Sequence, residues 1–343
     1  MTVTVKRSTR LATLPKAHLH VHLEGAARAT TIAEFANRHH RPTPAVTAFS
    51  DLPAFMHCFR QVTDVIATPE DLGRVICEFV ADEAAEGVRY SEPMVGPWLY
   101  ADRFGWPVPD TLAFIDDTFL QAARRHDIEV RYLLGVNWAR PPGWIEQAAR
   151  FAVKYADHNV AGLGLTGQEP TDGFERYSRA AAIVRAHGLL VVPHLGETQG
   201  PQAIRAAIAG MRPDRIAHGV RAAADPRLLD ELAEDRIVCD VCPTSNVRLA
   251  VISDLASHPL PRMLRHGVPV TLNADDPTLL ATTLTSEYQH VGRAFGLTDP
   301  QLADLAAEGT STAGMTETTC AAMRSSIRRW LADDQLTTEG HHG

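Results

Sequence analysis

Short apolar runs rich in β-branched residues alternate with longer amphipathic stretches along most of the chain. This alternation predicts βαβ units and a parallel sheet. Several amphipathic stretches end in a glycine directly before the next apolar run, and glycine commonly follows the last turn of a helix. The predicted strands are residues 17–22, 88–93, 128–135, 160–165, 189–194, 215–218, 237–242 and 268–273.

Eight consecutive strand–helix units predict an α/β fold of the (β/α)8 type, a TIM barrel, because so many units close more readily into a barrel than into an open sheet. Single barrels reach this size, so we expect residues 1–343 to form one domain. Two segments lie outside the eightfold pattern. One is a helical insertion at 41–68, after the first strand, and the other is a set of extra helices at 286–334.

The 41–68 insertion carries apolar residues at helical spacing, among them Phe55, Phe59 and Ile66. One interpretation is that this face packs against the barrel. The other is that it forms an apolar lid beside the active site, which a helix inserted after the first strand would reach.

The composition is that of an ordinary globular protein, with 45% hydrophobic and 22% charged residues. No apolar run approaches the roughly 20 residues of a membrane-spanning helix, and the first residues show no export signal, so we expect a cytoplasmic protein without a membrane partner. The formal charge of −8 argues against a nucleic-acid partner, since binding phosphates needs a basic face. A small-molecule substrate fits better, and nothing points to a particular oligomeric state.

Titratable side chains stand where four of the predicted strands end. In a TIM barrel the active site gathers at the C-terminal ends of the strands. The residues at these ends are His20 and His22 on the first strand, His194 and Glu197 after the fifth, His218 after the sixth, and Asp275 and Asp276 after the eighth.

The spacing of His20 and His22 suits a metal site, because residues i and i+2 of a strand point to the same face. His194 and Asp275 would complete a set of three histidines and a carboxylate, which leaves room for a water molecule, as in catalytic zinc sites. Zinc lowers the pKa of a bound water to near 7 and so provides a nucleophile at neutral pH. We therefore predict one Zn²⁺ per chain. His258 and several other histidines are expected to be solvated.

Taken together, these motifs resemble the adenosine deaminase family of metal-dependent hydrolases, and the resemblance extends over residues 14–277. The matching segments are LPKAHLHVHLEG at 14–25, GLGLTGQE at 162–169, HLGE at 194–197, RIAHG at 215–219, CPTSN at 242–246 and LNADDP at 272–277. The first of these places the two histidines of the H-x-H motif on the family's zinc-ligand positions.

The resemblance implies a role for each motif residue. His20, His22, His194 and Asp275 would hold the zinc ion, and His218 would work with Asp275 to orient and deprotonate the water.

Three further residues would bind the purine ring, and one would contact what is attached to it. Glu197 would act as the general acid that protonates N1, which needs a raised pKa. Gly167 would offer a backbone group to the ring, and Asp276 would form a hydrogen bond with N7. Glu24 would contact the substrate beyond the ring.

The sequence departs from the family pattern at a few positions near the site. Glu24 replaces an aspartate that is common in adenosine-specific members, and Met94 replaces an arginine in the second strand. Asp240 stands where a longer glutamate normally supports the histidine equivalent to His218, and His18 replaces a usual glutamate. Such partners orient the catalytic groups, so we expect altered support around the metal.

The resemblance implies hydrolytic removal of the 6-amino group from a 6-aminopurine nucleoside, either adenosine, 2′-deoxyadenosine or 6-amino-6-deoxyfutalosine. Residues 166–169 are closer to the nucleoside enzymes, whereas Glu24 is more typical of relatives that act on adenine or on 6-amino-6-deoxyfutalosine. Free adenine is therefore the first alternative. The others are a purine-binding barrel without activity and a zinc hydrolase that acts on a different amide or an ester.

Overall fold

The computed structural model describes residues 9–46, 49, 51–312 and 314–339. Its strands are all parallel and follow the order β1-β2-β4-β5-β6-β7-β8-β9, while β3 pairs with β2 just before β4 does so. The strand bounds are β1 (Lys16–His22), β2 (Val88–Val95), β3 (Glu129–Val130), β4 (Tyr132–Asn137), β5 (Val160–Thr166), β6 (Leu190–Leu195), β7 (Arg215–His218), β8 (Val238–Val241) and β9 (Val270–Leu272). The predicted (β/α)8 barrel is confirmed.

The barrel closes between the last strand and the first at the level of the predicted metal ligands. The backbone N–H of His22 donates to the carbonyl of Asp275 (2.8 Å), and the N–H of Asp275 donates to the carbonyl of His20 (3.1 Å). One step below, the side-chain oxygen of Asn273 accepts hydrogen bonds from the N–H groups of Leu19 and His20. Closure of the barrel therefore places residues of β1 directly beside Asp275.

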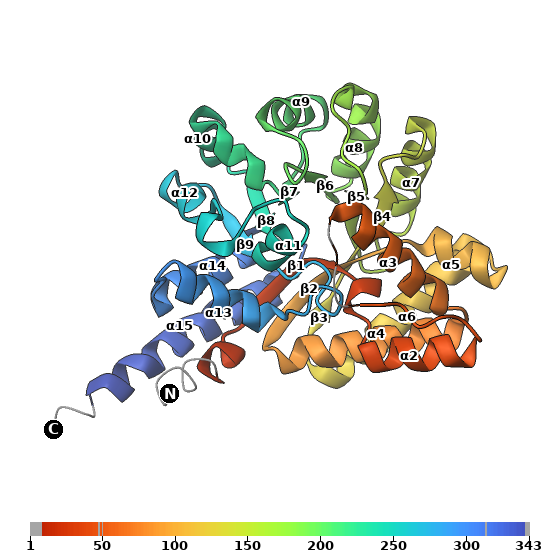
Figure 1. Ribbon diagram of the computed structural model, residues 1–343, viewed down its shortest axis with the longest axis horizontal. Coiled ribbons are helices and arrows are strands. Elements are labelled where there is room, and N and C mark those ends of the chain that lie inside the picture. Colours follow the sequence, from red (N-terminus) through yellow and green to blue (C-terminus); the bar gives the residue numbers. More distant parts are fainter. Residues whose placement is uncertain (1–8, 47–48, 50, 313, 340–343) are drawn as a thin grey trace.

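Helices surround the strands on the outside (Figure 1). Proline occupies the first turn of many of them, where its missing N–H costs nothing. The helices are α2 (Ala29–Arg38), α3 (Leu52–Val65), α4 (Pro69–Ala85), α5 (Pro97–Phe104), α6 (Val108–His126), α7 (Pro142–Lys154), α8 (Ser178–Arg185), α9 (Pro201–Met211), α10 (Pro226–Glu234), α11 (Pro243–Arg248), α12 (Leu260–Arg265), α13 (Leu284–Ala294), α14 (Asp299–Thr312) and α15 (Glu317–Glu339). No helix among the described residues is long and apolar enough to cross a membrane.

Met94 fills the interior of the barrel where the family resemblance led us to expect an arginine. Its side chain is buried together with Leu133 and Val192, and it packs against two glycines, Gly135 of β4 and Gly164 of β5. A β-carbon on Gly135 would lie 2.9 Å from Met94 Cγ, and one on Gly164 would lie 3.0 Å from its sulfur. The glycines therefore make the space that the long methionine side chain occupies.

The insertion and the turn between α14 and α15 lie at opposite ends of the barrel. In the insertion, α3 approaches the C-terminal ends of the strands, and the ring of Phe59 lies 6.1 Å from the ring of His22. The turn between α14 and α15 lies at the other end, where the N–H of Gly314 donates to Glu92 (2.6 Å) and Arg215 donates to the carbonyl of Thr312 (2.9 Å).

Candidate active site

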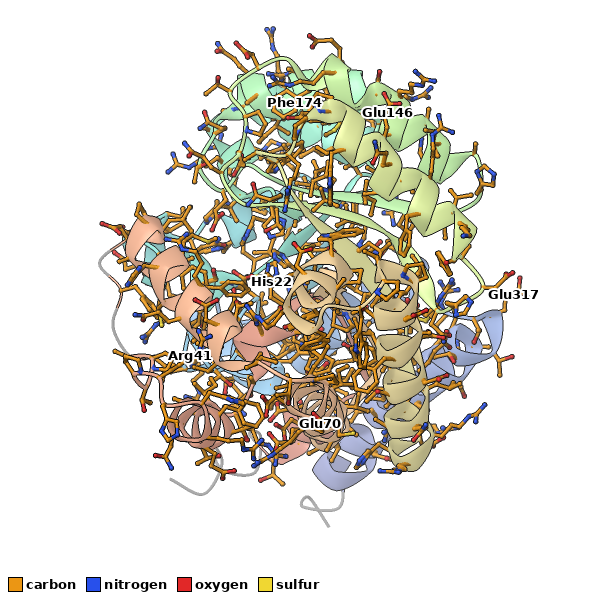
Figure 2. All side chains as sticks on the ribbon, turned by 90° about the vertical axis from the view of Figure 1, so that its right-hand side faces the viewer. His22, Arg41, Glu70, Glu146, Phe174 and Glu317 are labelled. Atoms are coloured by element: carbon orange, nitrogen blue, oxygen red, sulfur yellow. The ribbon has the colours of Figure 1, made fainter. Side chains whose placement is uncertain are left out.

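Three histidines and an aspartate meet at the C-terminal end of the barrel. The Nε2 atoms of His20 and His22 each lie 3.2 Å from Nε2 of His194 and 3.3 Å from Oδ1 of Asp275. His22 lies near the centre of the molecule in the side view (Figure 2). The sequence predicted this set, and the fold brings it together from three separate strand ends.

The spacing of these atoms fits a small divalent cation. Zinc binds imidazole nitrogen and carboxylate oxygen at about 2.0–2.1 Å, so two ligands of a tetrahedral site lie about 3.3 Å apart. Four of the six separations, those of His20 and His22 from His194 and from Asp275, are 3.2–3.3 Å. Imidazole nitrogens that face one another at this distance need a cation or a proton between their lone pairs, and the donor set is one that zinc prefers.

Partners on the far side of these residues fix their orientation. The Nδ1–H of His194 donates to the carbonyl of Leu165 (2.9 Å), and that of His20 donates to the carbonyl of Asp240 (3.2 Å). Both bonds leave the Nε2 lone pair directed at the centre of the cluster. The Ser245 hydroxyl donates to Oδ2 of Asp275 (2.7 Å) and leaves Oδ1 for the cluster.

The electrostatics of the cluster favour a neutral His194 and an ionised Asp275, and Asp275 raises the pKa of His20 against the effect of burial. Burial lowers the pKa of His194 well below its ordinary value, and the neighbouring His20 and His22 lower it further. Burial alone would raise the pKa of Asp275, but the same neighbours pull it well below its ordinary range. Asp275 and His218 also have positive φ angles of 61° and 72°, and such backbone strain concentrates at functional sites.

Glu197 lies at the edge of the cluster as a buried carboxyl group. Burial raises its pKa well above the ordinary value, and the negative charges of Asp275 and Glu169 raise it further. Its Oε1 atom lies 3.7 Å from Nε2 of His218. A raised pKa favours the protonated form, which a general acid requires.

Glu169 holds the loop that carries Glu197, and the sequence analysis missed this role. Its carboxylate accepts hydrogen bonds from four consecutive backbone N–H groups, those of Gly196 (2.8 Å), Glu197 (2.9 Å), Thr198 (2.8 Å) and Gln199 (3.3 Å). The available signal was its place at the end of the matched GLGLTGQE segment, after β5.

The predicted substrate-binding residues take different positions around the site. Oδ1 of Asp276 is buried and has no hydrogen-bond partner in the part of the chain that the structure describes. Glu24 accepts a hydrogen bond from the hydroxyl of Tyr100 (2.7 Å), a residue of α5. Gly167 has a φ of 89°, and a β-carbon there would lie 2.5 Å from the side chain of Asn137.

The carboxylate of Asp240 binds partners other than His218. The side chain of Asp240, shorter than the usual glutamate, accepts hydrogen bonds from Arg215 (2.9 Å) and Thr271 (2.7 Å). The group facing Nδ1 of His218 is instead the side-chain amide of Asn246 (3.2 Å). Asp240 still contributes to the site, but through its backbone carbonyl.

Two histidines outside the cluster, His258 and His18, are buried and have structural partners. His258, which we expected to be solvated, is buried with 3% of its surface exposed. His18 binds the carboxylate of Glu83 through Nδ1 (2.9 Å) and accepts the backbone N–H of Ala274 through Nε2 (3.1 Å). The histidine that replaces a usual glutamate therefore supports the residue before Asp275.

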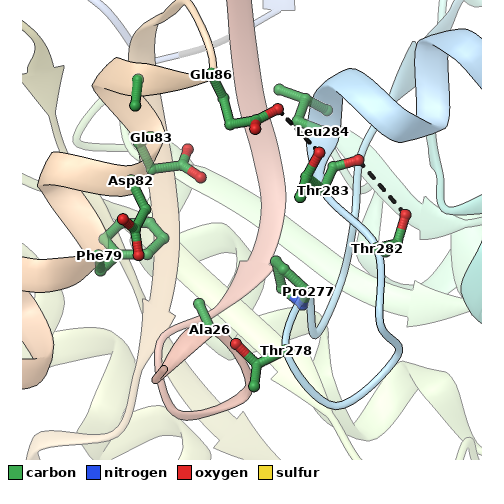
Figure 3. A pocket seen from close by; sticks show the side chains of 11 residues that line it. Ala26, Phe79, Asp82, Glu83, Glu86, Pro277, Thr278, Thr282, Thr283 and Leu284 are labelled. Carbon is green, nitrogen blue, oxygen red and sulfur yellow. Dashed lines mark hydrogen bonds between the residues drawn. The ribbon is translucent and has the colours of Figure 1, made fainter. Parts of the chain in front are cut away.

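A separate pocket of about 290 Å³ lies between α4 and the turn that follows Asp276 (Figure 3). Its acidic side chains already have partners: Asp82 pairs with Arg28, Glu83 with His18, and Glu86 accepts a hydrogen bond from Thr283. The metal-ligand candidates do not line it. This pocket is therefore a neighbour of the aspartate turn and is distinct from the His–Asp cluster.

The chain matches a known protein family over most of its length. The family model described as adenosine deaminase matches residues 15–330. The chain belongs to the adenosine deaminase family. It is thus a member of a family of hydrolases that deaminate purine-type substrates.

Two relatives from Streptomyces coelicolor show the range of activities within this deaminase family. A putative adenosine/adenine deaminase is 34% identical over 342 residues, which cover 95% of this chain and 99% of the relative. An aminodeoxyfutalosine deaminase is 35% identical over 309 residues, which cover 87% of this chain and 80% of the relative.

Solved structures of similar shape include an adenine deaminase from Arthrobacter aurescens, with a TM-score of 0.85 at 24% identity, covering 93% of this chain and 99% of that one. An amidohydrolase from Burkholderia ambifaria, solved with bound Zn, has a TM-score of 0.84 at 26% identity and covers 97% of this chain and 94% of that one.

Proposed function

We propose that this family member removes the 6-amino group of a 6-aminopurine nucleoside by hydrolysis, yielding the 6-oxo purine and ammonia, with one zinc ion held by His20, His22, His194 and Asp275. One observation, the arrangement of the ligand atoms near Glu197, supports this proposal most directly. Four candidate metal-ligand atoms, with four of their mutual separations at 3.2–3.3 Å, lie near a buried carboxyl group, Glu197, whose pKa is raised well above its ordinary value.

Zinc is supported by the spacing of the donor atoms and by the zinc found in the Burkholderia ambifaria amidohydrolase. When bound, this metal supplies Lewis acidity, which makes water nucleophilic at neutral pH. The protein's part is to keep Asp275 ionised and His194 neutral, as the pKa shifts of both groups indicate.

The remaining residues act on the ring and on the attacking water. Protonated Glu197 donates to N1, so the ring can accept electrons as water attacks carbon 6. The pKa of Asp276 is raised well above its ordinary value by burial and by Asp275, which favours the protonated form that can donate to N7. Gly167 offers a backbone group to the ring, and His218 and Asp275 orient the water for its deprotonation.

The residues that face the substrate beyond the purine ring select which group on N9 is accepted. Glu24, held by Tyr100, faces the substrate beyond the ring, and α3 forms an apolar lid that reaches the site through Phe59. Adenosine, 2′-deoxyadenosine and 6-amino-6-deoxyfutalosine are the nucleoside candidates, in line with the two Streptomyces coelicolor relatives. Free adenine is the second candidate, favoured by the glutamate at position 24 and by the first relative's name.

The proposal is tested by incubating the zinc-loaded protein with these four compounds and following the absorbance of the adenine ring. A decrease with one of them identifies the substrate, and no change with any 6-aminopurine would overturn the proposal. A Glu197→Gln variant should retain its zinc and lose most of its activity. A protein that binds purines without turnover, or that hydrolyses an amide or ester, would fail the first assay whatever its zinc content.

A further inference from the structure

His218 is the last of three side chains joined by hydrogen bonds, and the other two have no part in the proposed chemistry. The backbone N–H of Leu260 donates to Nδ1 of His258 (3.1 Å), Nε2 of His258 lies 3.2 Å from Oδ1 of Asn246, and Nδ2 of Asn246 lies 3.2 Å from Nδ1 of His218. All three side chains are buried. Asn246 belongs to the matched CPTSN segment, to which no role was assigned.

The direction of this chain follows from its first bond. A backbone N–H can only donate, so Nδ1 of His258 must accept, and the ring proton of His258 must lie on Nε2. That proton is donated to Asn246, so the amide presents its oxygen to His258 and its NH₂ group to His218. The NH₂ group can only donate, so Nδ1 of His218 must accept.

His218 therefore carries its proton on Nε2, the nitrogen that faces the site. This nitrogen lies 3.7 Å from Oε1 of Glu197, and the ring packs edge-on against the rings of His20 (4.5 Å between centroids) and His194 (5.4 Å). A neutral histidine with a proton on Nε2 donates a hydrogen bond from that atom and has no lone pair there.

We propose that Asn246 and His258 are positioning residues that hold His218 as the Nε2–H tautomer, so that it orients the attacking water as a hydrogen-bond donor and does not take up its proton. This rests on the proposed function of the site. The carboxylate of Asp275 is then the acceptor on this side of the cluster. The shortened Asp240 side chain is consistent with this arrangement, since it binds Arg215 and leaves Nδ1 of His218 to an amide donor.

Burial favours the neutral form of the groups in this hydrogen-bonded chain of His258, Asn246 and His218, which we call the relay. It lowers the pKa of His258 from 6.5 to about 4, so the ring is uncharged across the neutral range. Asn246 is fully buried and cannot exchange its partners for water. The relay is thus a chain of neutral groups whose polarity is fixed at its far end by the main chain at Leu260.

The direct test is the ¹⁵N NMR spectrum of the zinc-loaded wild-type enzyme labelled in its histidine ring nitrogens, with His218 assigned by its absence from the His218→Gln spectrum. Protonated and unprotonated ring nitrogens have well-separated shifts. The expected result is a protonated Nε2 and an unprotonated Nδ1. A protonated Nδ1 would overturn the proposal, and this measurement does not depend on the substrate.

Asn246→Asp provides the kinetic test, because it keeps the size of the side chain and replaces the donor with an acceptor. We expect kcat to fall about 100-fold with KM changed by less than about threefold, and the His218 proton to move to Nδ1. Asn37→Asp, at an exposed position of α2, is the matched control for the change in charge. Wild-type kcat in Asn246→Asp would overturn the proposal.

His258 is tested by comparing two replacements. His258→Gln retains an N–H donor for Asn246 and should remain within about fivefold of the wild-type kcat, whereas His258→Leu removes the donor and should lose about 10- to 100-fold. Equal losses in both variants would indicate a role in packing alone and contradict the relay. If no 6-aminopurine is turned over, the proposed function fails, while the NMR result still decides the tautomer.

Discussion

Gly25 lies against the side chain of Asp276 so closely that a β-carbon at position 25 would overlap with Oδ1 and lie 2.5 Å from Cγ. The glycine of the HLEG segment therefore makes room for the carboxyl group that we place on N7 of the purine. Asp276 is fixed by this fit rather than by a hydrogen bond of its Oδ1 atom, which has no partner among the described residues.

Gly25→Ala should consequently displace Asp276 and lower kcat/KM about 100-fold, since misplacing a positioning group by about 1 Å has effects of that size. Zinc content should change much less, because the three atoms nearest to the added β-carbon all belong to Asp276 and none to a proposed ligand. Steady-state kinetics and metal analysis measure both quantities. Gly143→Ala is the control, since a β-carbon there meets nothing within 4 Å. Full activity of Gly25→Ala would contradict the role given to Asp276.

Glu169→Gln should lower kcat about 10- to 100-fold, because an amide has one acceptor oxygen where the carboxylate oxygens together bind four backbone N–H groups. The loop that carries Glu197 would then lose its alignment while the zinc ligands stay in place. Kinetics with metal analysis distinguishes this from loss of zinc. Glu175→Gln, an exposed change on the same connection, should behave as wild type. A Glu169→Gln enzyme with wild-type kcat would show that the loop is held by other contacts.

The barrel and the metal ligands were predictable because their signals are local. The H-x-H spacing places His20 and His22 on one face of β1 whatever surrounds the strand, and the barrel alone brings His194 and Asp275 to them. One predicted strand differs, since 128–135 is divided at Arg131, whose side chain donates to the carbonyls of Val160 and Gly314.

The supporting contacts were not predictable because they depend on side-chain direction. Asp240 is on the expected strand, yet its carboxylate points to Arg215, 25 residues earlier, and not to His218. Likewise, nothing in the sequence around His258 indicates that its ring lies beside Asn246. Strand and helix periodicity identify which residues share a face, but the partner of a buried polar group is decided by the packing around it.

Lys16 predicts a dependence of stability on pH. Burial lowers the pKa of its ammonium group from 10.5 to about 7, and the group donates to the carbonyls of Leu11 and Leu14 (2.8 Å each). Between pH 7 and 10.5 the unfolded chain therefore binds more protons than the folded one at this residue. Its contribution to the free energy of unfolding rises with pH in that window, by up to about 1.4 kcal/mol per pH unit.

The measurement is urea unfolding of wild type and Lys16→Met at several pH values from 7 to 10. The difference between the two curves should grow with pH in favour of the wild type. Lys154→Met removes an exposed lysine and should show no such trend. A constant difference between wild type and Lys16→Met across this range would contradict the lowered pKa.

The contact between His18 and Glu83 predicts that a second substitution restores the stability lost in a His18 variant. His18→Glu would restore the residue usual in the family, but here it would place two buried carboxylates against each other, because Glu83 now occupies the partner position. We expect a loss of about 3 kcal/mol in the free energy of unfolding, the usual cost of an unpaired buried charge. The double variant His18→Glu with Glu83→Gln should recover most of it, since the amide can donate to the new carboxylate, which can still accept the N–H of Ala274. Denaturant unfolding of the two single variants and the double variant gives the coupling energy directly. Simple additivity of the two substitutions would mean that the histidine and the glutamate do not act as a unit in holding the turn before Asp275.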